Sequence, residues 1–74
     1  MAGCESMKDT PTHVLKSRAD RDFEYQKWEP ASKLYAEVVS REPQNGEAQY
    51  RYGVSLSMQG EYDKAESALQ VASS

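Results

Sequence analysis

The sequence has few of the residues that metal sites, disulfides and membrane spans require. One cysteine and one histidine in 74 residues exclude an internal disulfide and a four-ligand metal cluster. No apolar run approaches the roughly 20 residues of a membrane-spanning helix. The net charge is −3 with both signs interspersed, whereas a nucleic-acid or anionic-membrane surface needs a basic stripe. These shortages favour one small, soluble helical domain with a modest core.

The groups that could carry catalysis are too scattered to form an active site. Asp20, Asp22 and Glu24 alternate along one predicted helix, so their carboxylates point to different faces. Cys4 and His13 lie far apart in a polar segment, and nothing there holds them within hydrogen-bonding reach as nucleophile and base. We therefore expect no enzymatic activity, no bound metal and no cofactor.

Helical periodicity is clearest between residues 50 and 69, where two apolar stripes flank the pair Gly60-Glu61. The stripes consist of Tyr52, Gly53 and Leu56 before the turn and of Tyr62, Ala65, Ala68, Leu69 and Ala72 after it. A glycine inside a helix costs about 1 kcal/mol relative to alanine, which a sequence accepts where two backbones come close. We expect a tight helical hairpin in which Gly53 faces Ala65 and Tyr62 fills the gap beside the turn. Gly53→Ala is then expected to be nearly neutral.

The same stretch closely resembles one tetratricopeptide repeat. The resemblance rests on an apolar-Gly pair, a large apolar residue one turn later, a Gly-acidic-Tyr turn, and then an alanine, a large apolar residue and a small one. These are Tyr52-Gly53, Leu56, Gly60-Glu61-Tyr62, Ala65, Leu69 and Ala72. The resemblance implies an all-α fold of helix-turn-helix hairpins that stack into a right-handed superhelix.

An offset of 34 residues aligns the chain with itself without gaps. Residue sizes agree better than identities, as packing requires; the aligned pairs include Ala19/Gly53, Gln26/Gly60, Trp28/Tyr62, Ala31/Ala65, Tyr35/Leu69 and Val38/Ala72. Arg18 and Asp22 stand where the second repeat has Tyr52 and Leu56, so the first helix is interpreted as a polar cap.

The predicted organisation is a flexible tether at 1–11 followed by two tandem repeats at 12–45 and 46–74. Helices are expected near 12–25, 30–41, 46–59 and 62–72. Thr10 and Glu29 are predicted as N-caps before Pro11 and Pro30, and Asn45 as the N-cap of the third helix. The second repeat is five residues short of 34, which predicts that the chain is part of a longer protein.

Two functions fit this organisation. The resemblance implies that the leading helices line a concave groove for a protein or peptide, which makes the chain an interaction module. The groove would contain His13, Lys16, Asp20, Phe23, Glu24, Glu47, Tyr50, Val54, Ser57 and Met58. The other interpretation of the apolar members is packing between adjacent repeats, and of the charged members a solvated face. The alternative function is self-association, in which the uncovered ends of two repeats pack against other copies.

The segment Met1-Ala2-Gly3-Cys4 resembles the processing site of a bacterial lipoprotein, although Met1 stands where Leu is usual and the preceding hydrophobic segment is missing. If Cys4 is a lipidated mature N-terminus, the module is tethered to a membrane on the periplasmic side and serves in an envelope complex. If Cys4 is an incidental cysteine, the expected location is cytoplasmic.

Overall fold

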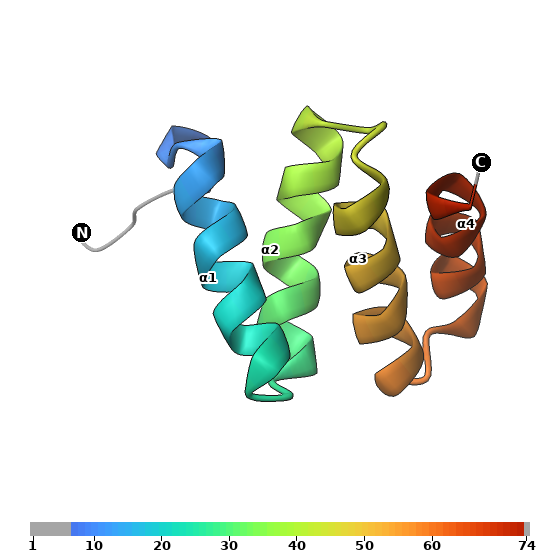
Figure 1. The fold of residues 1–74 in the computed structure, drawn as a ribbon. Helices are drawn as coiled ribbons and strands as arrows, with labels where there is room; N and C mark the ends of the chain where they lie inside the picture. Colours follow the sequence, from blue (N-terminus) through green and yellow to red (C-terminus); the bar gives the residue numbers. More distant parts are fainter. Residues whose placement is uncertain (1–6, 74) are drawn as a thin grey trace.

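The computed structural model describes residues 7–73, which form four α-helices that lie side by side in chain order (Figure 1). A 3-10 turn η1 (Met7–Asp9) precedes α1 (Thr12–Glu24), α2 (Trp28–Arg41), α3 (Gly46–Met58) and α4 (Tyr62–Ala72). The predicted all-α fold of two helical hairpins is confirmed. Each hairpin packs closely within itself, and α2 packs against α3 to join them.

Helix α1 begins at the predicted residue, but its N-cap differs from the prediction. The helix begins at Thr12, and Pro11 is the N-cap residue, whose carbonyl accepts the backbone N–H groups of Val14 and Leu15. Thr10 is therefore not the N-cap. Its carbonyl instead accepts a hydrogen bond from Nη1 of Arg41 at 2.6 Å, and the Thr12 hydroxyl accepts one from the same nitrogen at 3.1 Å. The end of α2 is thereby fastened to the start of α1.

The start of α2 also differs. The helix begins at Trp28 with Lys27 as N-cap, so Glu29 is not the cap and Pro30 is the third helical residue. A proline in the first turn of a helix loses nothing, because the N–H groups there have no partner within the helix. Pro30 therefore allows a helix start over several positions, and the preceding turn decides which one is used.

The turns inside the two hairpins have the same geometry at positions 34 residues apart. Gln26 and Gly60 both have left-handed backbone angles, with φ of 61° and 84°. In each turn a backbone N–H bonds back five residues, from Lys27 to Asp22 in the first hairpin and from Glu61 to Leu56 in the second. This Schellman pattern is a common end of a helix and usually contains glycine at the left-handed position.

The link between the hairpins is capped as predicted. The Asn45 side chain accepts the Ala48 N–H at 3.1 Å and donates to the Glu42 carboxylate at 3.0 Å. A side chain of this kind satisfies a backbone donor that the helix leaves without a partner. The start of α3 is thus fixed against the end of α2.

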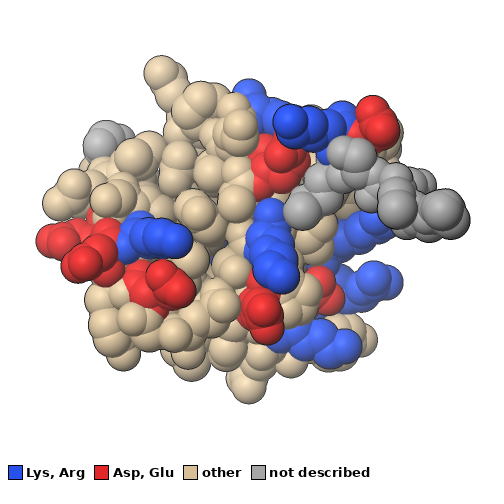
Figure 2. Space-filling view, turned by 180° about the vertical axis from the view of Figure 1, so that it is seen from behind, with Lys and Arg blue, Asp and Glu red and all other residues tan. Residues whose placement is uncertain are grey.

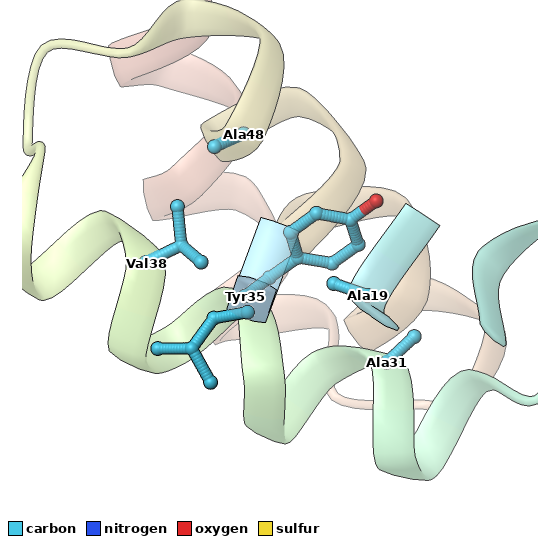
Figure 3. Close-up of a cluster of buried hydrophobic side chains, with 6 residues drawn as sticks. Ala19, Ala31, Tyr35, Val38 and Ala48 are labelled. Carbon is cyan, nitrogen blue, oxygen red and sulfur yellow. The ribbon is translucent and has the colours of Figure 1, made fainter. Parts of the chain in front are cut away.

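The core lies between α1, α2 and α3 (Figure 3). It is built around the ring of Tyr35, which is 1% exposed, and from small or branched residues: Leu15, Ala19, Ala31, Val38 and Ala48. Alanines at the contacts between helices let the backbones approach, and the one large ring fills the space that they leave.

The second hairpin is packed as closely as predicted, but by a different side chain. A Cβ atom added to Gly53 would lie 2.6 Å from Cγ of Leu69 and 3.2 Å from the Ala65 carbonyl oxygen. Leu69 thus covers Gly53. An alanine there overlaps the branch point of Leu69, so this geometry predicts that Gly53→Ala destabilises the hairpin and is not neutral.

Tyr62 does not fill the gap beside the turn, because its side chain is 70% exposed. The equivalent residue of the first hairpin, Trp28, packs edge-on against the ring of Phe23 with 5.4 Å between centroids. Ser57 occupies the position equivalent to Phe23, and a serine offers Tyr62 no ring to pack against.

Candidate protein-binding surface

The ten residues of the predicted groove are divided between exposed positions and contacts within the chain. His13 and Glu24 of α1 and Glu47, Tyr50 and Met58 of α3 are exposed. The other five are partly buried: Lys16, Asp20, Phe23, Val54 and Ser57. The chemical character of this surface depends on what these five partly buried side chains contact.

Asp20 connects three helices. Its Oδ1 atom accepts a hydrogen bond from the hydroxyl of Tyr35 on α2 at 2.5 Å and one from Nη1 of Arg51 on α3 at 2.6 Å. Burial, followed by the hydrogen bond to Asp20, raises the pKa of Tyr35 well above its usual range. The Tyr35 hydroxyl thus remains a donor, and the Oδ1 atom of Asp20 is used within the fold.

Arg51 was not among the residues selected from the sequence. Burial alone would lower its pKa, but the hydrogen bond to Asp20 and the neighbouring Tyr35 outweigh burial and raise it. Its second nitrogen bonds to Glu47 at 3.0 Å, and its guanidinium lies over the ring of Phe23, 5.8 Å from the centroid. The Glu47/Arg51 spacing of four residues was visible in the sequence, but the reach of Arg51 to α1 was not.

Lys16 is also held within the chain, because its ammonium pairs with the Glu42 carboxylate at 2.9 Å. Hydrogen bonds from Lys16 and from Asn45 lower the pKa of Glu42. Of the predicted residues on α1, Lys16, Asp20 and Phe23 therefore contact other parts of the fold, while His13 and Glu24 are free to face solvent. The contacts of Asp20 and Phe23 with Arg51 join α1 to α3, and the Lys16 contact joins α1 to the end of α2.

The predicted residues on α3 have a different environment. Tyr50 and Ser57 line two adjoining hollows between α3 and α4, with volumes of about 510 and 340 Å³. The other lining residues are Gly46, Tyr62, Ala65, Glu66, Leu69, Gln70, Ala72 and Ser73. We call this surface the α3–α4 groove. No helix of the described chain lies on the outer side of α4 (Figure 1).

The two hairpins could be unrelated helical hairpins or copies of a known repeat. A comparison with protein families decides between these alternatives. A family model described as tetratricopeptide repeat matches residues 22–74. This chain belongs to the tetratricopeptide repeat family. No curated protein and no solved structure matches the chain at a significant level.

Repeats of this family act as protein–protein interaction modules and are generally scaffolds without catalytic activity, and this general role applies to the chain. In residues 7–73 no group of three His, Cys, Asp or Glu side chains could hold a metal ion. None of the described helices is both long and apolar enough to cross a membrane.

Proposed function

We propose that this tetratricopeptide module binds a protein or peptide through the face shared by α1 and α3. The observation that supports the proposal is the clasp of Asp20, Arg51 and Phe23, which fixes the two helices relative to each other. The same two helices carry five exposed side chains: His13, Glu24, Glu47, Tyr50 and Met58. A rigid base with exposed aromatic and flexible apolar groups is a suitable platform for a peptide, because little ordering entropy is lost on binding.

A random-peptide display library tests this proposal. Peptides selected on the folded protein are expected to shift the backbone amide resonances of α1 and α3 around His13 and Glu24. Met58→Ala is expected to weaken their binding, and Lys33→Ala, at an exposed position of α2, is the control. Selected peptides that shift only residues away from α1 would contradict the proposed surface.

Self-association is the second candidate function, and the α3–α4 groove favours it. The groove is open, and Tyr50 and Tyr62 beside it are 55% and 70% exposed. Covering such apolar surface with another copy stabilises a small repeat protein by mass action. Sedimentation over a hundredfold dilution series tests this; a constant monomer mass and a constant Tm at all concentrations would exclude it.

We also propose, as a more specific function, that Cys4 carries a lipid anchor. Cys4 lies outside the described residues, and the sequence Ala2-Gly3-Cys4 is the support for it. An acylated cysteine would hold the module at a membrane, on the periplasmic side of a bacterial envelope, where it would help to assemble a larger complex. Mass spectrometry of the mature N-terminus in the native host gives the answer, because an unmodified N-terminal Met would exclude the anchor and leave a cytoplasmic location.

A further inference from the structure

On the face shared by α1 and α3 (the α1–α3 face), the Lys and Arg side chains are already engaged by carboxylates of the fold. Lys16 pairs with Glu42 at 2.9 Å. Arg51 donates to Asp20 at 2.6 Å and to Glu47 at 3.0 Å, so one guanidinium serves two carboxylates. A partner's carboxylate could reach either cation only by displacing a carboxylate of this chain, which would then lose its own counter-charge.

The α1–α3 face also carries an excess of negative charge. Glu24 is exposed and forms no ion pair within residues 7–73. With Glu24 included and His13 counted as neutral at pH 7, four carboxylates stand against two cations, which leaves a net charge of −2. An acidic peptide would be repelled by this face, whereas a cationic one would be attracted to it.

Two of the carboxylates keep an oxygen for a partner. Asp20 accepts both of its hydrogen bonds at Oδ1 and Glu47 accepts its bond at Oε2, and the second oxygen of each has no donor in the described part of the chain. The two side chains come from different helices but line one recess of about 30 Å³, roughly the volume of one water molecule. A Lys or Arg side chain that approaches this recess from solvent can therefore form charge-assisted hydrogen bonds with both.

An apolar stripe continues from Glu47 along α3. Tyr50, Val54 and Met58 follow it at helical spacing, and the side chains of Tyr50 and Met58 are more than half exposed. Residues three positions apart on a helix are neighbours, so a cation beside Glu47 also reaches the ring of Tyr50. The stripe gives the alkyl stem of a basic residue, and an apolar residue next to it, a surface on which to pack.

We propose that the α1–α3 face selects peptides in which a Lys or Arg stands beside an apolar residue, and that it rejects acidic peptides. This inference rests on the proposed function and names the chemical class of its partner. The cationic group pairs with Glu47 and with the neighbouring Asp20, and the apolar residue contacts Tyr50 and Met58.

The opposite side of α1 has free cations. Arg18 is two residues from both Lys16 and Asp20, which places it on the other side of the helix, and Arg21 follows one turn later. Both arginines are exposed, and neither forms an ion pair with any described residue. In Figure 2, seen from behind, most of the Lys and Arg side chains gather over the side where α1 and α2 lie. An acidic peptide that binds the chain is therefore expected to contact Arg18 and Arg21 and not the α1–α3 face.

The first test compares two libraries of short displayed peptides that share one set of neutral residues and differ in their charged residue, Lys in one and Glu in the other. Both are selected on the folded protein at pH 7, and the amide resonances of the ¹⁵N-labelled protein map each selected peptide. Peptides that shift the stretch from Glu47 to Met58 are expected to come from the Lys library, with an apolar residue beside the lysine.

The outcomes of this selection separate the inference from the proposed function. Glu-library peptides that map to the stretch from Glu47 to Met58 would overturn the charge preference and leave the proposed function standing. Peptides of both libraries that map only to other parts of the chain would contradict the proposed face itself, and the preference with it.

The second test removes one carboxylate. Glu47→Gln is expected to weaken the binding of a Lys-library peptide that maps to α3 by up to about fivefold, as for an exposed ion pair. Glu29→Gln is the matched control, because Glu29 on α2 is 73% exposed and pairs with Lys33 four residues later, as Glu47, 72% exposed, pairs with Arg51. Equal effects of the two variants would reduce the preference to the overall charge of the molecule and overturn the pairing with Glu47.

A change in the peptide completes the test. Norleucine in place of the peptide's lysine keeps the alkyl stem and removes the charge. The exchange should weaken binding to the unmodified protein more than binding to Glu47→Gln, because the variant lacks the carboxylate that the lysine pairs with. Equal losses on the two proteins would show that the lysine charge acts at another site, and would also overturn the pairing.

Discussion

The guanidinium of Arg51 on α3 bonds to the carboxylate of Asp20 on α1 at 2.6 Å, although the two residues are 31 positions apart in the chain. The pair is partly buried, with side chains 30% and 45% exposed, and the Tyr35 hydroxyl shares the same carboxylate oxygen. It connects the leading helices of the two repeats, which otherwise touch little. The relative placement of α1 and α3 therefore depends on a polar contact as well as on the apolar packing of α2.

Breaking this contact is expected to destabilise the whole fold. Asp20→Asn should lower the free energy of unfolding by about 1 kcal/mol, because it weakens the charge-assisted bond from Arg51 and leaves that guanidinium paired with the exposed Glu47 carboxylate. Adding Arg51→Met should cost less than the sum of the two single changes. Urea unfolding of the four proteins measures the coupling. Lys33→Met is the control, since its 3.7 Å pair with Glu29 is exposed on both sides and should be worth at most about 0.5 kcal/mol.

Ser55→Ala is expected to have the opposite effect, because removing this polar group should stabilise the fold. Its hydroxyl is completely buried, and no partner lies within hydrogen-bonding range in the described chain. Ser55→Ala should raise the free energy of unfolding by about 0.5–1 kcal/mol, because the buried hydroxyl is unsatisfied and alanine is the better helix former.

Ser32→Ala is the matched control for Ser55→Ala. Ser32 is also buried, but its hydroxyl donates to the Glu29 carbonyl and accepts from Gln59, both at 2.8 Å. This variant should therefore lose stability. Equal effects of the two changes in thermal melts would contradict the assigned difference between the hydroxyls.

Gln26 is expected to be a site of easy stabilisation. Its φ of 61° is costly for a residue with a side chain, whereas Gly60 adopts the equivalent conformation in the second hairpin without that cost. Gln26→Gly should raise the free energy of unfolding by about 0.5–1 kcal/mol. Lys27→Gly, one residue later at an ordinary φ of −88°, should lower it and controls for the added flexibility of the unfolded chain.

The elements that the sequence predicted well are those decided by local chemistry and residue size. Gly60 marks a turn because glycine adopts a left-handed backbone angle without strain, and Asn45 marks a cap because its side chain accepts a nearby backbone N–H. The pattern around Gly53 predicted a close hairpin correctly. The cap near Pro11 and the helix start near Pro30 differed from the prediction, since a proline is compatible with several positions of the first turn. Helix propensity alone does not determine at which of these positions the helix begins.

The polar contacts of the surface were not predictable in the same way. A carboxylate such as Asp20 has several basic residues within reach of its helix, and Lys16 is one turn away in the sequence. In the structure Lys16 pairs with Glu42, and Asp20 with Arg51. Long flexible side chains reach different helices at similar cost, so the choice depends on backbone placement to within about an ångström. The exposure of Tyr62 was not predictable for a similar reason. It depends on the side chain at position 57, which is a serine and gives the ring nothing to pack against.

The Lys16–Glu42 pair is expected to make stability depend on pH. Hydrogen bonds from Lys16 and Asn45 hold the pKa of Glu42 below its ordinary 4.5, so the folded state binds this proton less readily than the unfolded chain does. The stabilisation is present above pH 4.5 and is lost as the pH falls through the lowered pKa. The difference in unfolding free energy between the protein and Lys16→Met should therefore be present at pH 7 and shrink at strongly acidic pH. A difference that stays constant with pH would show that Lys16 acts through packing of its stem.

The contact between Gly53 and Leu69 gives the sharpest test of the second hairpin. A Cβ on residue 53 would lie 2.6 and 2.7 Å from Cγ and Cδ2 of Leu69, closer than two such carbons approach. The overpacking cost of about 1–3 kcal/mol outweighs the gain of about 1 kcal/mol in helix propensity, because the clash falls on the branch point of Leu69, so Gly53→Ala should lower the Tm. Leu69→Ala alone should also destabilise, because it uncovers Gly53 and removes apolar contact.

The two changes together should be less harmful than their sum, because the added methyl group enters the space that Leu69 leaves. A double-mutant cycle by urea unfolding is expected to give a favourable coupling of about 1 kcal/mol or more. Gly46→Ala provides the control, since a Cβ there lies 3.6 Å from its nearest neighbour, the Ala72 carbonyl oxygen, at an ordinary contact distance. Strict additivity of Gly53→Ala and Leu69→Ala would mean that the backbone of the hairpin moves apart to admit the methyl group, and that α3 and α4 are not held together by this contact.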